Sequence, residues 1–270
     1  CANWEWGYFS PYYRLAGRDD VDAVIHLGDY IYEYASGRYG DTAIRKNLPR
    51  NEIVSLEDYR TRHSLYRSDR GLTLVSQQHP MIAIWDDHEI ANDAYSEGAQ
   101  NHQPDKEGEY QQRKAIAKRV YYEWMPIRES EKLYRAYSYG PLADLIMLDE
   151  RLEARTKQAD SITAPSYNSE DRSMLGREQL DWLKNNLSNS KATWKVLGNQ
   201  VIYSDVYFRA VNPKRPRNLD AWDGYPAEKK NLGDFIVSHN IKDLVIITGD
   251  THSSWAIEVA INVPKTYVPK

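Results

Sequence analysis

Three apolar stretches of the chain each run into an aspartate with a histidine or tyrosine close by. They cover residues 24–33 (VIHLGDYIYE), 81–89 (MIAIWDDHE) and 245–252 (VIITGDTH). The apolar part of each stretch suits a buried strand, and open α/β sheets place their sites at the carboxyl ends of strands. The pattern therefore predicts three strands that deliver possible metal ligands to one place.

The first and last of these stretches share a glycine before the aspartate. Gly28 allows a tight turn into Asp29, and Asp250 and His252 are spaced i, i+2 after the last strand. Alone, Asp29 would be read as a turn or helix-cap residue and Tyr32 as a packing residue. The pair gains weight because the two residues are three apart, and one turn of helix would put them on the same face.

The middle stretch places two adjacent carboxylates beside an imidazole. Asp86, Asp87 and His88 follow an apolar run that begins after Pro80. Neighbouring carboxylates repel each other unless a cation or a proton offsets their charge. The alternative is a solvated acidic loop, but the apolar lead-in favours a site.

The full set of polar residues expected at strand ends is rich in carboxylates and poor in imidazoles. Such a set suits hard divalent or trivalent cations better than a structural zinc ion. Two cations about 3.5–4 Å apart can clamp a phosphoryl group, and the planar fork of Arg151 could pair with phosphate oxygens. The sequence contains no P-loop, no Gly-x-Ser-x-Gly elbow and no His-Glu-x-x-His. The set comprises Asp29, Tyr32, Asp86, Asp87, His88, Asn92, Asp149, Arg151, Asn199, Asp250 and His252.

The elements that would position these residues alternate between strands and helices. Apolar periodicity predicts helices over 111–124, 175–187 and 227–239, a hairpin over 134–149 and a further strand over 194–201. Residues 56–66 also have helical spacing, and His63 within them is read as a surface or packing residue. This alternation indicates an α/β layered fold.

Composition narrows the range of partners. The 270 residues carry a net charge of −4 without a long basic run, which argues against nucleic acid as a specific partner. No apolar run approaches the roughly 20 residues needed to span a bilayer. Cys1 is the single cysteine, so no intrachain disulfide can form. Cys1 is open to three readings: a buried hydrophobe, an acylated terminus or a metal ligand.

Seven motifs, in order along the chain, resemble the PhoD family of alkaline phosphatases and phosphodiesterases. They are Cys1 with Gly-Tyr-Phe, Leu-Gly-Asp-Tyr-Ile-Tyr-Glu, Trp-Asp-Asp-His-Glu-x-x-Asn-Asp, Leu-Asp-x-Arg, Gly-Asn-Gln, Asp-Ala-Trp-Asp-Gly-Tyr-Pro and Thr-Gly-Asp-x-His-Ser-Ser-Trp. The resemblance implies a calcineurin-like core, a four-layer α/β/β/α metallophosphoesterase sandwich with mixed sheets. It also implies one Fe³⁺ with Ca²⁺ ions and hydrolysis of phosphate mono- or diesters.

The resemblance further implies a role for each matching residue. Cys1, Tyr32 and His252 would ligate iron, Asp29 would bridge iron and calcium, and Asp87 and Asp250 would ligate calcium. Asp87-His88-Glu89 lines up with the Asn-His-Glu of the superfamily, which places His88 near the phosphate as general acid or charge stabiliser. The second choices are Asn92 for metal, and Arg151 and Asn199 for catalysis.

We expect residues 1–270 to form a single catalytic domain, without the N-terminal β-sandwich domain and the C-terminal segment that family members usually carry. The resemblance implies a secreted, periplasmic or cell-surface protein, although no export signal is present in this chain. Two alternatives remain open: a calcium-binding or weakly active, non-catalytic fragment, and a phospholipase D-type activity on lipid head groups. The oligomeric state is left open as well.

Overall fold

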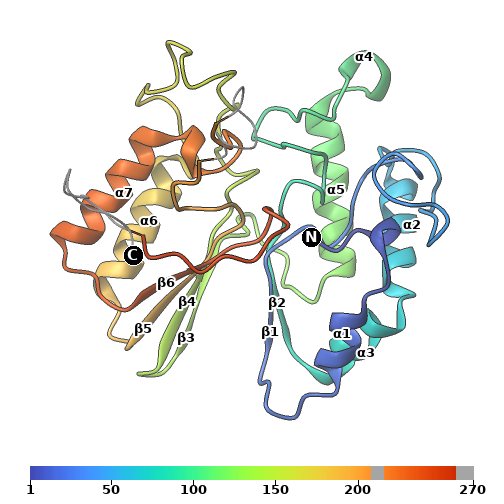
Figure 1. Cartoon of the computed structure of the whole chain (residues 1–270), viewed down its shortest axis with the longest axis horizontal. Coiled ribbons are helices and arrows are strands. Elements are labelled where there is room, and N and C mark those ends of the chain that lie inside the picture. Colours follow the sequence, from blue (N-terminus) through green and yellow to red (C-terminus); the bar gives the residue numbers. More distant parts are fainter. Residues whose placement is uncertain (208–215, 260–270) are drawn as a thin grey trace. The chain divides into compact units, whose positions relative to one another are not determined.

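The structure, a computed structural model, describes residues 1–207 and 216–259 (Figure 1). It divides into two compact units. The first comprises Cys1–Leu133 and Asp149–Glu153, and the second comprises Tyr134–Leu148 and the described part of Ala154–Lys270. No helix in the described ranges combines the length and apolarity required to cross a bilayer.

Two short parallel strands lie at the centre of the first unit. β1 (Val24–His26) pairs with β2 (Met81–Ala83) in the register Val24 to Met81. The crossover between them carries two helices, as parallel pairing requires a long connection. The other elements of this unit are η1 (Trp4–Trp6), α1 (Ser10–Ala16), α2 (Leu56–Arg67), α3 (Arg70–Gln78), α4 (Pro104–Glu107) and α5 (Tyr110–Trp124).

Local sequence explains where the crossover helices begin. The Ser55 side chain accepts a hydrogen bond from the Asp58 N–H, and the Asp58 carboxylate accepts one from the Ser55 N–H, which is a capping box at the start of α2. The Asp69 carboxylate caps α3 by accepting from two backbone N–H groups. These caps fix both helices before any tertiary contact is considered.

A buried arginine on α2 holds the loop that leaves β1. The Arg62 guanidinium donates to the carbonyls of Tyr34 at 3.1 Å and Leu48 at 3.0 Å, and it also donates to the Tyr32 carbonyl. Unpaired carbonyls in a buried loop would be costly. Arg62 therefore lets this loop pack against the helix.

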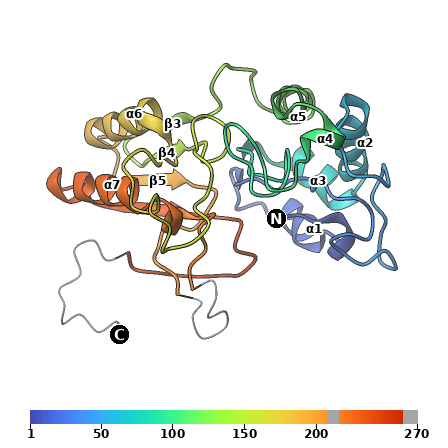
Figure 2. The same cartoon turned by 90° about the horizontal axis from the view of Figure 1, so that it is seen from above.

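The second unit is a four-stranded mixed sheet covered by two helices (Figures 1 and 2). Its strand order is β3-β4-β5-β6, with β3 antiparallel to β4 and the other neighbours parallel. The strands are β3 (Arg135–Tyr139), β4 (Ala143–Met147), β5 (Trp194–Gly198) and β6 (Leu244–Ile247), and the helices are α6 (Gly176–Asn189), η2 (Trp222–Gly224) and α7 (Pro226–Ser238).

One face of this sheet forms the core of the second unit. Ile146, Leu197 and Ile246 face each other across adjacent strands and pack in one apolar cluster with the helices. Leu183 of α6 and Leu232 of α7 join the same cluster and are buried. The period-two pattern of the strands and the apolar stripe of each helix meet here.

The α/β class with mixed sheets is confirmed, as are the hairpin and the helices predicted over 111–124, 175–187 and 227–239. Residues 29–33 form no helix, so a helical turn is not what relates Asp29 to Tyr32. Sequence reasoning also missed α1 and α3, which have only 7 and 9 residues. The expectation of one catalytic domain over 1–270 stays a prediction.

Candidate functional site

The loops that leave β1 and β2, called the strand exits below, approach each other closely because one of them carries a glycine. Gly28 has φ +102°, and a Cβ at this position would lie 2.3 Å from the Asp86 backbone nitrogen. No side chain fits there, and few residues other than glycine adopt this backbone conformation. Asp29 follows with φ 51° and is 1% exposed. Two carboxylate-bearing loops are thus brought side by side, as the sequence predicted for these strands.

The Glu89 side chain is hydrogen-bonded to both strand exits. Its carboxylate accepts from the N–H groups of Asp29 at 2.9 Å, Tyr30 at 2.5 Å and Asp86 at 2.7 Å. Burial, followed by the nearby Asp29 charge, raises the pKa of Glu89. Sequence reasoning gave Glu89 no role, and the match to Asn-His-Glu was the signal that could have found it.

Asp29 is surrounded by other predicted ligands of the first unit. The Tyr32 hydroxyl donates to Asp29 Oδ2 at 2.9 Å, and the Cys1 sulfur lies within 4.8 Å of an Asp29 carboxylate oxygen. Backbone bonds hold the chain start in place, since the Cys1 amino group donates to the Gly28 carbonyl and the Ala2 N–H to the Asp29 carbonyl. Burial, then the Asp29 charge, raises the pKa of Tyr32 far above its usual value, so the phenol is protonated in this arrangement.

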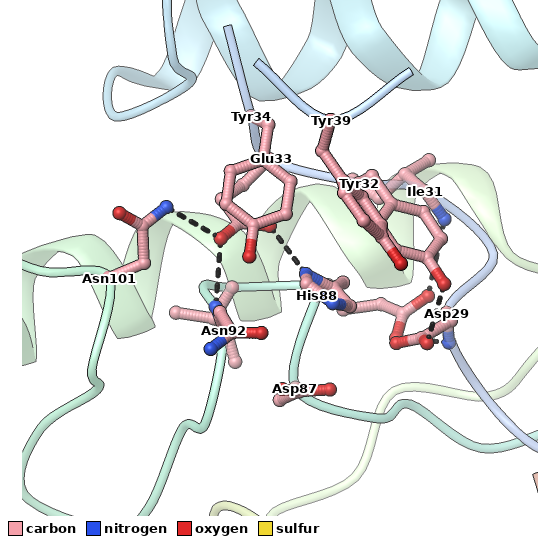
Figure 3. A network of polar contacts seen from close by, with 12 residues as sticks. Asp29, Ile31, Tyr32, Glu33, Tyr34, Tyr39, Asp87, His88, Asn92 and Asn101 are labelled. Carbon is pink, nitrogen blue, oxygen red and sulfur yellow. Dashed lines mark hydrogen bonds and ion pairs between the residues drawn. The ribbon is translucent and has the colours of Figure 1, made fainter. Parts of the chain in front are cut away.

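His88 is oriented by a second buried glutamate (Figure 3). Glu33 accepts from His88 Nδ1 at 2.6 Å, from the Asn92 N–H at 2.8 Å and from Asn101 Nδ2 at 2.7 Å. Burial opposes a charge on the imidazole, but the charges of Asp87 and Glu33 outweigh it and raise the pKa of His88 well above its usual value. Sequence reasoning missed Glu33 because a glutamate after a strand is ordinarily exposed.

The ligand atoms of Asp29, Asp87 and His88 lie within 4.8 Å of one another, and all three residues are buried. Asp29 Oδ1 is buried and accepts no hydrogen bond from any residue that the structure describes. A buried carboxylate oxygen without a donor is costly unless a cation satisfies it. The donor set therefore fits a hard cation.

Arg151 and Asn92 also lie beside this cluster, but their side chains bind other side chains of the protein. Arg151 Nε donates to Asp86 Oδ1 at 2.5 Å, and its Nη2 lies 3.5 Å from Asp87 Oδ1. Asn92 Nδ2 donates to the Gln100 side chain at 3.0 Å. The guanidinium offsets part of the acidic charge here and thereby orients Asp86.

The remaining predicted site residues belong to the second unit. Asp250 and His252 follow β6 with φ 58° and 51°, which is sparsely populated backbone for residues other than glycine. Asn199 follows β5, where its Oδ1 accepts from Trp222 Nε1 at 3.1 Å and its Nδ2 donates to the Val201 carbonyl. Whether these residues join Cys1, Asp29 and Asp87 in one site stays a prediction.

The motif over 220–226 organises a loop of the second unit. Asp220 accepts from the Arg155 guanidinium at 2.5 Å, and Arg155 also donates to the Tyr225 hydroxyl at 3.0 Å. A Cβ on Gly224 would lie 2.0 Å from the Leu219 carbonyl oxygen. Together with the bond from Trp222, this loop fixes the orientation of the Asn199 amide.

The fold and the site define an α/β protein that gathers carboxylate and imidazole side chains at the ends of parallel strands. The family model described as PhoD-like phosphatase matches residues 1–268, and the chain belongs to this family. The resemblance seen in the sequence is thereby confirmed.

Two relatives are similar to nearly the whole chain. Alkaline phosphatase D of Bacillus subtilis (strain 168) is 38% identical over 281 residues, which cover 98% of this chain and 47% of the relative. A solved structure described as that of PhoD has a TM-score of 0.82 at 36% identity and covers 94% of this chain and 50% of its own. The chain thus spans about half the length of the relatives that it matches.

Proposed function

We propose that the chain hydrolyses phosphate mono- or diesters with the help of bound cations, as an alkaline phosphatase or phosphodiesterase. The observation that carries the proposal is the cluster of Asp29, Asp87 and His88, whose ligand atoms lie within 4.8 Å of one another. The name of the 38% identical relative, alkaline phosphatase D, supports the reaction class.

The residues proposed to hold the cations combine oxygen, nitrogen and sulfur donors. We propose Fe³⁺ and Ca²⁺, because a thiol and a phenol suit iron while carboxylates suit calcium. When bound, such cations would lower the pKa of water and neutralise charge on the phosphoryl oxygens. The proposed ligands are Cys1, Asp29, Tyr32, Asp87, Asn92, Asp250 and His252.

His88 is the proposed acid at the leaving oxygen. Glu33 binds Nδ1 of the imidazole at 2.6 Å, so the ring is held in one orientation and Nε2 is left to face the substrate. The charges of Asp87 and Glu33 raise the pKa of His88, which suits either proton donation or charge stabilisation. Arg151 acts by orienting Asp86 and Asp87, and Asn199 remains the second choice for a substrate contact.

Turnover with and without a chelator tests the proposal. Purified protein should hydrolyse p-nitrophenyl phosphate or bis-p-nitrophenyl phosphate, and chelation should abolish the activity. Metal analysis should find iron and calcium, and thiolate or phenolate bound to iron should colour the protein. Chelator-resistant turnover would overturn the proposed cation dependence, and full activity in a colourless, iron-free protein would reject Cys1 and Tyr32 as iron ligands.

The same proposal includes export to the periplasm, the cell surface or the medium, which the family resemblance implies. It can be checked by locating the native protein in fractionated cells. Recovery in the cytoplasm alone would contradict it.

A further inference from the structure

Aromatic rings form a continuous row from the surface of the first unit to His88. Trp6 meets Tyr39 at 5.9 Å between ring centroids, Tyr39 meets Tyr34 at 5.4 Å, and Tyr34 meets His88 at 5.3 Å. Trp6, Tyr39 and Tyr34 are called the aromatic row below. Figure 3 shows the rings of Tyr34 and Tyr39 beside His88, on the side that also carries Tyr32.

The rings of the row meet at steep angles, and the row is most exposed at Trp6. The planes of Trp6 and Tyr39 meet at 77° and those of Tyr39 and Tyr34 at 62°, so the rings contact each other edge to face. Trp6 is 61% exposed, while Tyr34 and Tyr39 are half-buried. In an edge-to-face pair one ring keeps a face that another flat group can cover.

The row also offers hydrogen-bond donors. Neither the Tyr34 nor the Tyr39 hydroxyl bonds to a residue that the structure describes. A tyrosine hydroxyl beside a reacting group is a donor for a substrate oxygen. The row therefore combines apolar rings with two phenolic donors, of which that of Tyr34 belongs to a ring in contact with the proposed acid.

The row is held rigidly by buried contacts. The Glu5 carboxylate is fully buried and accepts from the Ser36 hydroxyl at 2.6 Å, from the Gly37 N–H at 2.8 Å and from the Asn47 N–H at 2.9 Å. A Cβ on Gly40 would lie 2.3 Å from the Glu5 Cβ, so the loop with Tyr39 packs directly on η1. Because Trp6 follows Glu5, the same carboxylate fixes both sides of the contact between Trp6 and Tyr39.

We propose that the aromatic row binds the organic part of the substrate and favours esters whose organic group contains a ring over open-chain esters. This inference rests on the proposed function, which places the phosphate beside His88. A sugar ring or a nucleobase has a flat face that can stack on Tyr39 and Trp6. An open chain can do this only in part, and it loses more conformational freedom on binding.

Three phosphomonoesters with the same primary alkoxide leaving group test the preference. They are glycerol 3-phosphate, glucose 6-phosphate and adenosine 5′-monophosphate, whose chemistry at phosphorus is alike. We expect kcat/KM for at least one ring ester to exceed that of the open-chain ester about tenfold, as expected for one stacking contact. Preference for glucose 6-phosphate alone or for both ring esters identifies a sugar face, and preference for adenosine 5′-monophosphate alone identifies a base.

Variants connect the preference to the row. Trp6→Ala and Tyr39→Leu should each lower the ratio of ring-ester to open-chain kcat/KM about tenfold, mainly through KM, whereas Trp6→Phe should restore most of it. Tyr13→Ala is the matched control, because Tyr13 is 49% exposed and lies outside the row. It should leave the ratio unchanged.

The outcomes separate the two proposals. Equal kcat/KM for all three esters in the active wild-type protein would overturn the ring preference and leave the proposed function intact. The same holds if Tyr13→Ala changed the ratio as much as Trp6→Ala. Hydrolysis of neither these monoesters nor bis-p-nitrophenyl phosphate by the metal-loaded protein would instead reject the proposed function.

Discussion

The strand exits at Asp29 and Asp250 have the same local sequence but are held in different ways. Each has a glycine followed by an aspartate in the left-handed region, with φ 51° at Asp29 and 58° at Asp250. The N–H of Asp29 is bound by buried Glu89, and the residue is 1% exposed. Around Asp250 the bonds run along the backbone, from the Gly249 N–H to the Gln200 carbonyl and from the Thr251 N–H to the Gly249 carbonyl, and Asp250 is half-buried.

This difference shows what the Gly-Asp pattern specifies by itself. It gives the turn at both exits, because aspartate tolerates the left-handed region better than most residues do. At the first exit, the buried carboxylate of Glu89 also bonds three backbone N–H groups on two loops. We infer that the bonds from Glu89 preorganise the first exit.

Removing one carboxylate charge from each exit should have the largest effect. Asp29→Asn and Asp250→Asn keep the left-handed backbone but weaken the proposed cation ligands, so we expect turnover to fall on the order of a thousandfold, about 4 kcal/mol. Metal content, measured on the same samples, should fall with it. The control is Asp243→Asn, since Asp243 also has φ 54° and is not a proposed ligand.

If Asp250→Asn kept the metal content and turnover of the wild type, Asp250 and its turn would not belong to the proposed site. The comparison would then be between a metal-binding exit and one with a structural role.

Adding a methyl group at Gly28 should have the next largest effect. The new Cβ would lie 2.3 Å from the Asp86 nitrogen, and backbone at this distance cannot yield without separating the two exits. We expect Gly28→Ala to lower the free energy of unfolding by about 3 kcal/mol or more, measured by denaturant unfolding. Gly108→Ala is the control, because Gly108 has φ +80° with no atom within 4 Å of the added Cβ.

Gly108→Ala should lose only about 1–2 kcal/mol, through backbone strain alone. Equal losses in the two variants would show that close approach at Gly28 contributes nothing.

Replacing the buried carboxylate of Glu89 tests the preorganisation directly. Glu89→Gln retains one acceptor oxygen but loses the charge that bonds Asp29, Tyr30 and Asp86. We expect metal affinity to fall about 10- to 100-fold, as for other groups that orient ligands. Equilibrium dialysis with the metal ions measures this affinity. An unchanged affinity would show that the bonds from Glu89 are not needed to orient the proposed ligands.

The sequence predicted the elements well because their signals are local. The strands before Asp29 and Asp87, the hairpin and three helices all follow from apolar periodicity and turn residues. α3 was missed because it is short. Asp29 and Tyr32 were paired because a helical turn would put them on one face, but no such turn forms. The contact survives because the loop itself returns the phenol to the carboxylate.

The groups that position the site were harder to predict because they act over long separations. Glu89 bonds the Asp29 N–H 60 residues away, Glu33 bonds His88 55 residues away, and Arg151 bonds Asp86 65 residues away. A buried glutamate has no local signature that distinguishes it from an exposed one. The pairing of β1 with β2 brings the partners of Glu89 and Glu33 together, and Arg151 reaches Asp86 from the segment Asp149–Glu153.

The smallest expected effect concerns the packing behind the first exit. His63 of α2 is buried and stacks on Tyr30, the residue after Asp29, and on Trp124. Burial first, then the charges of Arg67 and Arg62, lower the pKa of His63 to about 3. The folded protein thus resists protonation that the unfolded chain accepts below about pH 6.5.

This stabilisation is complete above the unfolded pKa and is lost as the pH falls toward the folded value. Between pH 7 and pH 5, His63 should contribute a loss of about 2 kcal/mol in the free energy of unfolding. His26, whose burial also lowers its pKa to about 3, should add a similar loss. Denaturant unfolding of wild type and His63→Phe at both pH values separates the contribution of His63 from that of His26. The free energy of unfolding of the variant should fall by about 2 kcal/mol less than that of the wild type. An identical loss in wild type and variant would show that the packing behind Asp29 is not a source of the acid sensitivity of the first unit.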